Sequence, residues 1–174
     1  MTLQTAAPIQ RLPGNPMNEP VEQVARAGHR VDSSYQRGLV WGTRRKALLV
    51  KSLLMGIHTG EISLNRRDWD GADYPVYVID GQQRLAAVKD FLDGHVAVPA
   101  SWFGVTADDA PTTDHGDGPY VRVPDLPPNA QGRFTRCSFS VRISEGLTRE
   151  QEAMVFELVN FAGVPQGQSD PDAS

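Results

Sequence analysis

The sequence has almost no cysteine and no long hydrophobic run, and each shortage excludes a class of protein. Cys137 is the single cysteine among 174 residues, which excludes an internal disulfide and a zinc cluster built from cysteines. The longest unbroken apolar run has four residues, as at 47–50, whereas a membrane-spanning helix needs about 20. Residues 1–20 contain four prolines and no apolar segment typical of a signal peptide. We therefore expect a cytoplasmic protein with no membrane partner.

The common nucleotide-binding and nuclease signatures are also missing. The chain has no Gly-x-x-x-x-Gly-Lys-Ser/Thr loop, no Gly-x-Gly-x-x-Gly string and no histidine-rich nuclease signature. Asp114, His115 and Asp117 are metal ligands by type, but their glycine- and proline-rich surroundings favour a solvated loop. Any nucleotide site must therefore have another design, and we expect no metal site built by the protein alone.

Positive charge is concentrated in one part of an acidic chain. The net charge is -4, yet residues 26–67 hold nine basic and two acidic residues, whereas residues 95–174 hold five basic and eleven acidic ones. This asymmetry indicates either one surface that faces an anion or a solvated helix face. The candidates for contact with DNA phosphates are the basic side chains of the first strong helix: Arg44, Arg45, Lys46 and Lys51.

The chain predicts a folded body over residues 21–164 between polar, flexible tails at 1–20 and 165–174. Apolar periodicity and capping residues predict three main helices, over 43–55 with Thr43 as the N-cap, over 82–92, and from a capping box of Thr148 and Gln151 to about 161. The last helix is expected to direct one apolar stripe inward: Met154, Val155, Leu158 and Val159.

Strands are expected where β-branched and aromatic residues cluster, within 57–64, over 74–79 and over 137–143. Residues 99–135 are rich in proline, glycine and aspartate and are expected to be irregular, with one short strand at 120–123. Helices and strands interleave without a regular βαβ repeat, so the sequence predicts a single α+β domain.

The sharpest local feature is the strand–turn–helix junction Ile79-Asp80-Gly81-Gln82-Gln83-Arg84. A helix N-terminus that follows a glycine presents unpaired N–H groups and is suited to a phosphate. Arg84 falls on the helix side that faces the protein, so this cation needs an anion. The anion is either a ligand phosphate or a carboxylate such as Asp80, in which case Arg84 is a brace.

A second candidate wall is Tyr35-Gln36-Arg37, with Trp41 close behind. Polar side chains between two large aromatic rings are suited to a base or a phosphate. The alternative, and the commoner case for such a loop, is that the rings dock on the core.

These segments together resemble the N-terminal domain of GmrSD-type restriction enzymes, in the ParB/sulfiredoxin-like superfamily. The resemblance spans about residues 30–165 and is carried by three features: Tyr35-Gln36-Arg37 with Trp41, the string from Val78 to Leu85, and Phe156-x-x-Val159-Asn160-x-x-Gly163-Val164-Pro165. It implies a ParB-like α+β domain that binds and hydrolyses a nucleoside triphosphate and is linked to defence against phage DNA.

The resemblance also assigns roles by position. Asp80, Gly81, Gln82, Gln83 and Arg84 would form the phosphate site. From its place in this turn we also expect Asp80 to bind Mg²⁺ or orient an attacking water, and Gln82 or Gln83 to position that water or a phosphate oxygen. The opposite wall would be lined by Tyr35, Gln36 and Arg37, and Asn160 would close it.

We expect no nuclease activity from this chain alone, because it has no room for a His-Asn-His nuclease domain. A separately encoded nuclease subunit is the expected partner. The lead hypothesis is a weak triphosphatase in restriction or anti-restriction. The rivals are a non-catalytic DNA-binding or regulatory module and an interaction protein with a decayed site.

Overall fold

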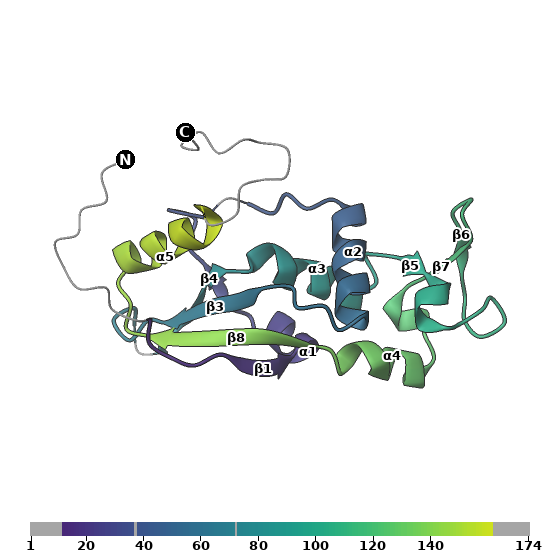
Figure 1. Ribbon diagram of the computed structural model, residues 1–174, viewed down its shortest axis with the longest axis horizontal. Helices are drawn as coiled ribbons and strands as arrows, with labels where there is room; N and C mark the ends of the chain where they lie inside the picture. The colour runs from purple at the N-terminus through teal and green to yellow at the C-terminus, as the bar shows by residue number, and fades with distance from the viewer. Residues whose placement is uncertain (1–11, 37, 72, 162–174) are drawn as a thin grey trace, which may run out of the picture.

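Two sheets of unequal size organise this α+β fold, with helices between and above them (Figure 1). The computed structural model describes residues 12–36, 38–71 and 73–161. The larger sheet has five strands in the order β1 (Met17–Pro20), β8 (Ser138–Glu145), β3 (Glu61–Arg66), β4 (Val76–Asp80) and β2 (Arg30–Val31).

The larger sheet is mixed, and β3 is its central strand. Strand β3 pairs parallel with β8 and antiparallel with β4, while β1 runs antiparallel to β8 and β2 runs parallel to β4. Residues 62–65 of β3 are all buried, so both faces of the sheet are covered there. The small sheet consists of short antiparallel strands, with β7 (Pro119–Val121) between β5 (Val98–Pro99) and β6 (Thr113–Asp114).

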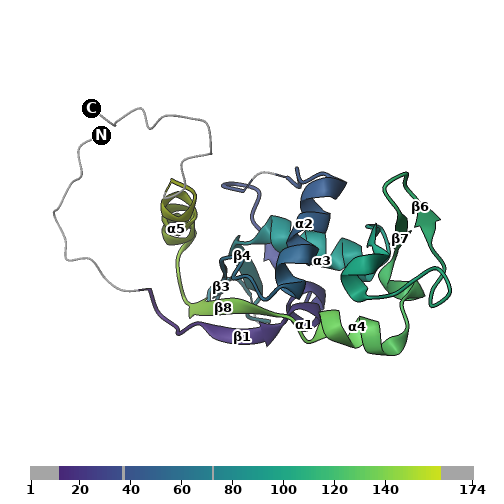
Figure 2. The same cartoon turned by 45° about the vertical axis from the view of Figure 1, so that its right-hand side comes forward.

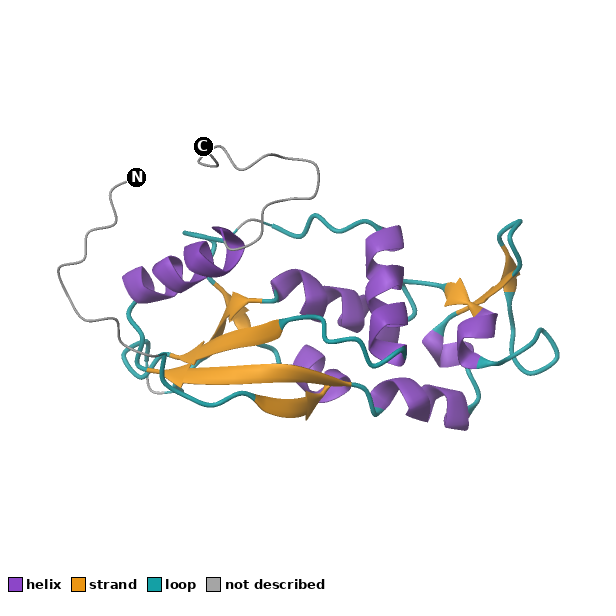
Figure 3. Ribbon diagram, viewed as in Figure 1, coloured by secondary structure: helices purple, strands orange, loops and turns teal. Residues whose placement is uncertain are grey.

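Four of the five α-helices gather on the side of the large sheet that leads to the small one (Figures 1 and 3). They are α1 (Val21–Arg26), α2 (Thr43–Leu54), α3 (Gln82–Leu92) and α4 (Pro128–Thr135). Phe91 on α3 packs against Phe103 and Phe134, with ring centres 6.1 and 4.7 Å apart, and all three side chains are buried. These contacts join α3, α4 and the 3₁₀ turn Ala100–Phe103, and the same core cluster includes Val98 and Val121 of the small sheet.

Helix α5 (Arg149–Phe161) lies apart from the other helices, over the opposite end of the large sheet (Figure 2). Its apolar contact is a small separate cluster of Val155 with Ile79 and Leu147, flanked by Leu12 and Phe156. The expected inward stripe is therefore wrong for three of its four members, because Met154, Leu158 and Val159 are 52%, 65% and 45% exposed. The side chain that turns inward beside Val155 is instead that of Glu152.

Several expected elements are confirmed, and the differences have local causes. The helix expected over 82–92 forms there, and the capping box closes through Thr148 N–H to Gln151 Oε1 (2.9 Å) and Gln151 N–H to Thr148 Oγ1 (3.3 Å). Helix α2 also forms, but its N-cap is Gly42 rather than Thr43.

The segment 99–135 is more ordered than expected, because proline can begin a helix as well as end one. Pro128 occupies the first turn of α4, where a missing N–H costs no hydrogen bond. Short strands and 3₁₀ turns fill the rest of the segment. At the other end of the chain, residues 17–20, which the composition places in a flexible tail, form β1, and the expected tail at 165–174 lies outside the described residues.

Candidate functional site

The junction between β4 and α3 turns at Gly81, which has a φ of 102° and is the N-cap of α3. The left-handed backbone favours glycine, and a Cβ at this position would lie 2.4 Å from Cδ1 of buried Ile62 and force that side chain to shift. No described side chain caps this helix, and its first intrahelical bond runs from Leu85 N–H to the Gly81 carbonyl (3.0 Å). The N–H groups of the first turn are therefore available to a ligand.

A pocket of about 180 Å³ lies at this helix start. It is lined by Gln36, Trp41, Arg45, Asp80, Gly81, Gln82, Gln83, Arg84, Phe156 and Asn160. The fold thus brings the five residues predicted to bind phosphate, 80–84, together with Gln36 of the predicted second wall and with Asn160. The pocket is smaller than the ~300–1,000 Å³ typical of sites that enclose a whole small molecule.

Arg84 is the most constrained side chain of the pocket. Its guanidinium donates hydrogen bonds to the carbonyl oxygens of Thr59 (2.9 Å) and Glu61 (3.0 Å) and forms a salt bridge with Asp80 (2.5 Å). Burial lowers the pKa of Arg84, and the charge of Asp80 opposes that shift. Arg84 thus connects residues 59–61 to the start of α3. Asp80 is the carboxylate that balances its charge, as expected if Arg84 has a structural role.

The two glutamines of the junction have different environments. Gln83 accepts hydrogen bonds from the N–H groups of Val40 (3.0 Å) and Trp41 (3.2 Å), and it donates one to the Gly38 carbonyl (3.0 Å). Its amide therefore holds the 38–41 loop in place as a wall of the pocket. Gln82 makes no hydrogen bond to any described side chain or loop, so its amide is the one that can reach a ligand.

The residues of the predicted second wall, Tyr35 and Gln36, have different environments. Gln36 is buried, and its amide donates to the carbonyls of Val78 and Ile79 on β4, so it anchors the loop to the sheet. Tyr35 does not line the pocket; its ring packs against Phe156 at 5.7 Å between centres. Arg37 lies outside the described residues.

The four basic residues expected at one DNA surface do not share one face of α2. Arg45 lines the pocket, with its guanidinium 4.6 Å from the centre of the Trp41 ring and no ion pair to a described residue. Lys46 forms a salt bridge with Asp90 on α3 (2.5 Å). Arg44 and Lys51 are exposed on the side that faces the small sheet.

A buried ionic network that was not expected from the sequence centres on Arg67 and Glu152. Arg67 and Glu152 are 1% and 0% exposed, and Nε of Arg67 donates to Oε1 of Glu152 (2.9 Å). Arg67 also pairs with Asp32 (2.7 Å), and its guanidinium lies 3.5 Å from the centre of the Tyr77 ring. Asn65 donates a further hydrogen bond to Glu152 (2.7 Å).

The network keeps Arg67 and Asp32 charged at neutral pH. Burial alone would lower the pKa of Arg67, but its hydrogen bonds to Glu152 and Asp32 raise it above the usual value. For Asp32, burial acts in the opposite direction and raises the pKa, but hydrogen bonds from Ser34, Arg67 and Arg149 hold that pKa well below its usual value. These charges are therefore permanent parts of the structure.

Tyr35 connects this network to the pocket. Its hydroxyl donates to Oε2 of Glu152 (3.0 Å), and burial together with the Glu152 charge raises the pKa of Tyr35. The network thereby holds Tyr35 and α5 in place, and α5 supplies Phe156 and Asn160 to the pocket. A charged residue three positions before Val155, on the stripe expected to face inward, was the available signal for this arrangement.

Residues 22–136 match the family described as GmrSD restriction endonuclease, N-terminal domain. The chain belongs to this family. The match covers about two thirds of the 174 residues and includes the β4–α3 junction, the 38–41 loop and Arg45. It ends before α5, so the Phe156 and Asn160 side of the pocket lies outside it.

Family membership confirms the resemblance seen in the sequence and links this GmrSD N-terminal domain to restriction. Neither the curated proteins nor the solved structures gave a match. Within the part of the chain that the structure describes, no helix is both long and apolar enough to cross a bilayer.

Proposed function

We propose that the pocket at the β4–α3 junction binds the phosphate groups of a nucleoside triphosphate, and that the domain is the nucleotide-dependent part of a restriction system. The observation that carries this proposal is the meeting of three phosphate-binding features. The open first turn of α3, the unpaired guanidinium of Arg45 and the amide of Gln82 all border one small pocket. A separately encoded nuclease subunit would carry out DNA cleavage.

The size of the pocket suits a ligand whose phosphate groups lie inside it and whose base lies outside. A volume of about 180 Å³ suits phosphate groups rather than an entire nucleotide. The base would then lie toward the rim, where the Trp41 and Phe156 rings supply flat apolar surface.

A magnesium ion fits this pocket only together with its nucleotide. Asp80 is the carboxylate of the lining, and the described residues contain no group of three side chains that could hold a metal. Mg²⁺ is commonly held by one or two carboxylates together with substrate phosphates. Asp80 would provide that ligand by exchanging its salt bridge to Arg84, and the ion would neutralise phosphate charge.

Thermal unfolding with each nucleoside triphosphate, with and without Mg²⁺, tests the binding. A ligand at 100 times its Kd adds about 2.7 kcal/mol, which raises Tm by roughly 5–11 °C for a chain of this size. Arg45→Gln should remove most of that rise. Arg44→Gln is the matched control, because it makes the same charge change on the same helix but does not line the pocket. The absence of a shift with any nucleotide, or equal losses in the two variants, would contradict the proposal.

Hydrolysis is a separate claim with its own measurement. Phosphate release by the parent protein, reduced more than nucleotide binding in Asp80→Asn, is the expected result. A protein that binds but releases no phosphate would be a binding module.

The second candidate function is contact with DNA as a non-catalytic regulatory module. The specific observation in its favour is that Arg44 and Lys51 are exposed on the same side of α2, away from the nucleotide pocket. In that case affinity for DNA should fall with salt, and no nucleotide should change Tm.

A further inference from the structure

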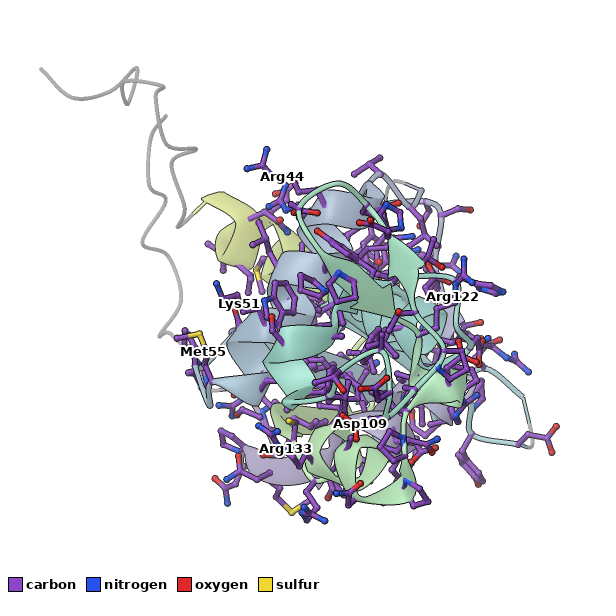
Figure 4. The ribbon with its side chains drawn as sticks, turned by 90° about the vertical axis from the view of Figure 1, so that its right-hand side faces the viewer. Arg44, Lys51, Met55, Asp109, Arg122 and Arg133 are labelled. Atoms are coloured by element: carbon purple, nitrogen blue, oxygen red, sulfur yellow. The ribbon has the colours of Figure 1, made fainter. Side chains whose placement is uncertain are left out.

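A second hollow, which we call the α2 groove, lies between α2 and the small sheet and has a volume of about 500 Å³. It is lined by Thr43, Arg44, Ala47, Leu48, His95, Ala97, Pro99, Trp102, His115, Tyr120 and Arg122. Figure 4 looks onto this end of the molecule, with Arg44 and Lys51 on α2 and Arg122 on the opposite side. The groove shares no lining residue with the nucleotide pocket.

The charged groups of the α2 groove are cationic. Arg44 and Arg122 are exposed, and neither makes an ion pair or hydrogen bond with a described residue. His95 is 70% exposed at its side chain, and its Nδ1 lies 3.7 Å from Asp90. No carboxylate is among the lining residues. The lining therefore offers an anion two guanidinium groups that pair with no described residue, and the carboxylates next to lining side chains are Asp90 at His95 and Asp117 at the Tyr120 hydroxyl.

Flat rings line the same groove and are held on ordered backbone. Trp102 lies in a 3₁₀ turn between the buried side chains of Ala100 and Phe103, and the Lys51 ammonium is 5.5 Å from the centre of its ring. Tyr120 belongs to the middle strand β7, and its ring centre is 4.5 Å from that of His115. These rings therefore need little ordering before they can stack on a planar ligand.

We infer that the α2 groove binds a single-stranded segment of nucleic acid, with its bases stacked on Tyr120 and Trp102 and its phosphates paired with Arg44 and Arg122. Aromatic surfaces interleaved with unpaired cations are the chemistry that single-strand-binding grooves use. A duplex hides its bases in the stack, so a recessed ring favours an unpaired strand. This inference goes beyond the nucleotide pocket and does not depend on it.

Acidic residues limit where such a strand can run. Asp114 and Asp117 lie at the turn between β6 and β7, and Asp117 accepts the hydroxyl of Tyr120 (3.0 Å). These carboxylates would repel phosphates at the tip of the hairpin. The nucleic-acid strand would therefore run along α2, past Lys51, rather than over the β6–β7 hairpin.

Fluorescence anisotropy of the full chain with a labelled oligothymidylate of ~12 nucleotides, measured over a range of salt concentrations, tests the inference. The double variant Arg44→Gln/Arg122→Gln should reduce the steepness of the log Kd against log salt plot by about 1.4, because each single-strand phosphate contributes about 0.7. Arg30→Gln/Arg136→Gln is the control, since both arginines are exposed, do not line the groove and carry the same charge. All four positions are on the surface, so the comparison does not depend on a core residue.

A second pair of variants isolates stacking. Tyr120→Leu should weaken binding about fivefold or more, the effect of losing one stacked base, whereas Tyr120→Phe keeps the ring and should bind as the parent does. Equal slopes in the two arginine pairs would overturn the inference. So would a duplex of the same length that binds as tightly as the single strand, or equal affinities for Tyr120→Leu and Tyr120→Phe in folded protein.

Discussion

Replacing Glu152 with glutamine tests whether the buried ionic network, rather than apolar packing, holds α5 on the sheet. The carboxylate accepts hydrogen bonds from Arg67 through both oxygens, from Asn65 (2.7 Å) and from Tyr35 (3.0 Å). Glutamine keeps nearly the same volume but replaces one acceptor oxygen with an NH₂ donor. That donor would face the N–H groups of Arg67, so at least one buried polar group would lose its partner.

The expected loss is large because Arg67 is 1% exposed and its charge has no access to water. Breaking a buried ion pair from one side costs about 3–5 kcal/mol. Asp32 remains as a partner of Arg67, so we expect the lower end, about 3 kcal/mol, or roughly 6–12 °C in Tm. Among the described side chains of α5, the apolar contacts that remain are those of buried Val155 and partly buried Phe156, so undocking of this helix should precede global unfolding.

Trp69 provides a local reporter for this event. Its indole N–H donates to the Leu147 carbonyl (3.1 Å), and its ring lies 5.0 Å from the Arg67 guanidinium. Urea unfolding followed by Trp69 emission, with Trp41 and Trp102 replaced by phenylalanine, should show an earlier transition than circular dichroism does. Glu157→Gln, an exposed change on the same helix, is the control. A loss within 0.5 kcal/mol for Glu152→Gln, the range of ordinary surface substitutions, would refute the reasoning.

Two further predictions concern Asp32 in this network and Arg84 in the pocket. Asp32 has a pKa below its usual 3.8, so its carboxylate stabilises the fold fully above about that pH and loses this effect as the pH falls. Asp32→Asn should therefore lower Tm at neutral pH, and the difference from the parent should shrink below pH ~4 in thermal scans. Arg84→Ala should also lower Tm, since Thr59, Glu61 and Asp80 lose a charged donor worth about 1.5–3 kcal/mol per bond. An unchanged Tm with lost nucleotide binding would show instead that Arg84 serves the ligand.

The parts of the fold that the sequence predicts well are those in which neighbouring residues determine the structure. The capping box of Thr148 and Gln151 and the helix over 82–92 depend on interactions within one or two turns. The glycine turn at Gly81 is equally local in its backbone requirement. Its closest steric neighbour, Ile62, comes from another strand and is not visible in the local sequence.

The ionic network could not be predicted because its partners are far apart in the chain. Arg67 and Glu152 are 85 residues apart, and each looks like an ordinary surface charge in its own segment. Their meeting depends on the parallel pairing of β3 with β8, which places the end of β3 beneath the start of α5. Amphipathic periodicity alone therefore assigned the wrong face of α5 to the core.

Helix α2 separates the two proposed sites by the direction of adjacent side chains. Arg44 and Arg45 are consecutive, and helical geometry turns them about 100° apart, so one faces the groove and the other faces the pocket. The Lys46–Asp90 salt bridge then ties α2 to α3, the helix whose first turn borders the nucleotide pocket. A basic cluster that composition presents as one surface is thus divided by the helix among three places: Arg44 lines the groove, Arg45 lines the pocket and Lys46 pairs with α3. Because no lining residue is common to both sites, any effect of a nucleotide on the binding of a nucleic-acid strand would have to pass through α2 or through the packing of Phe91 on α3 against Phe103 beside the small sheet.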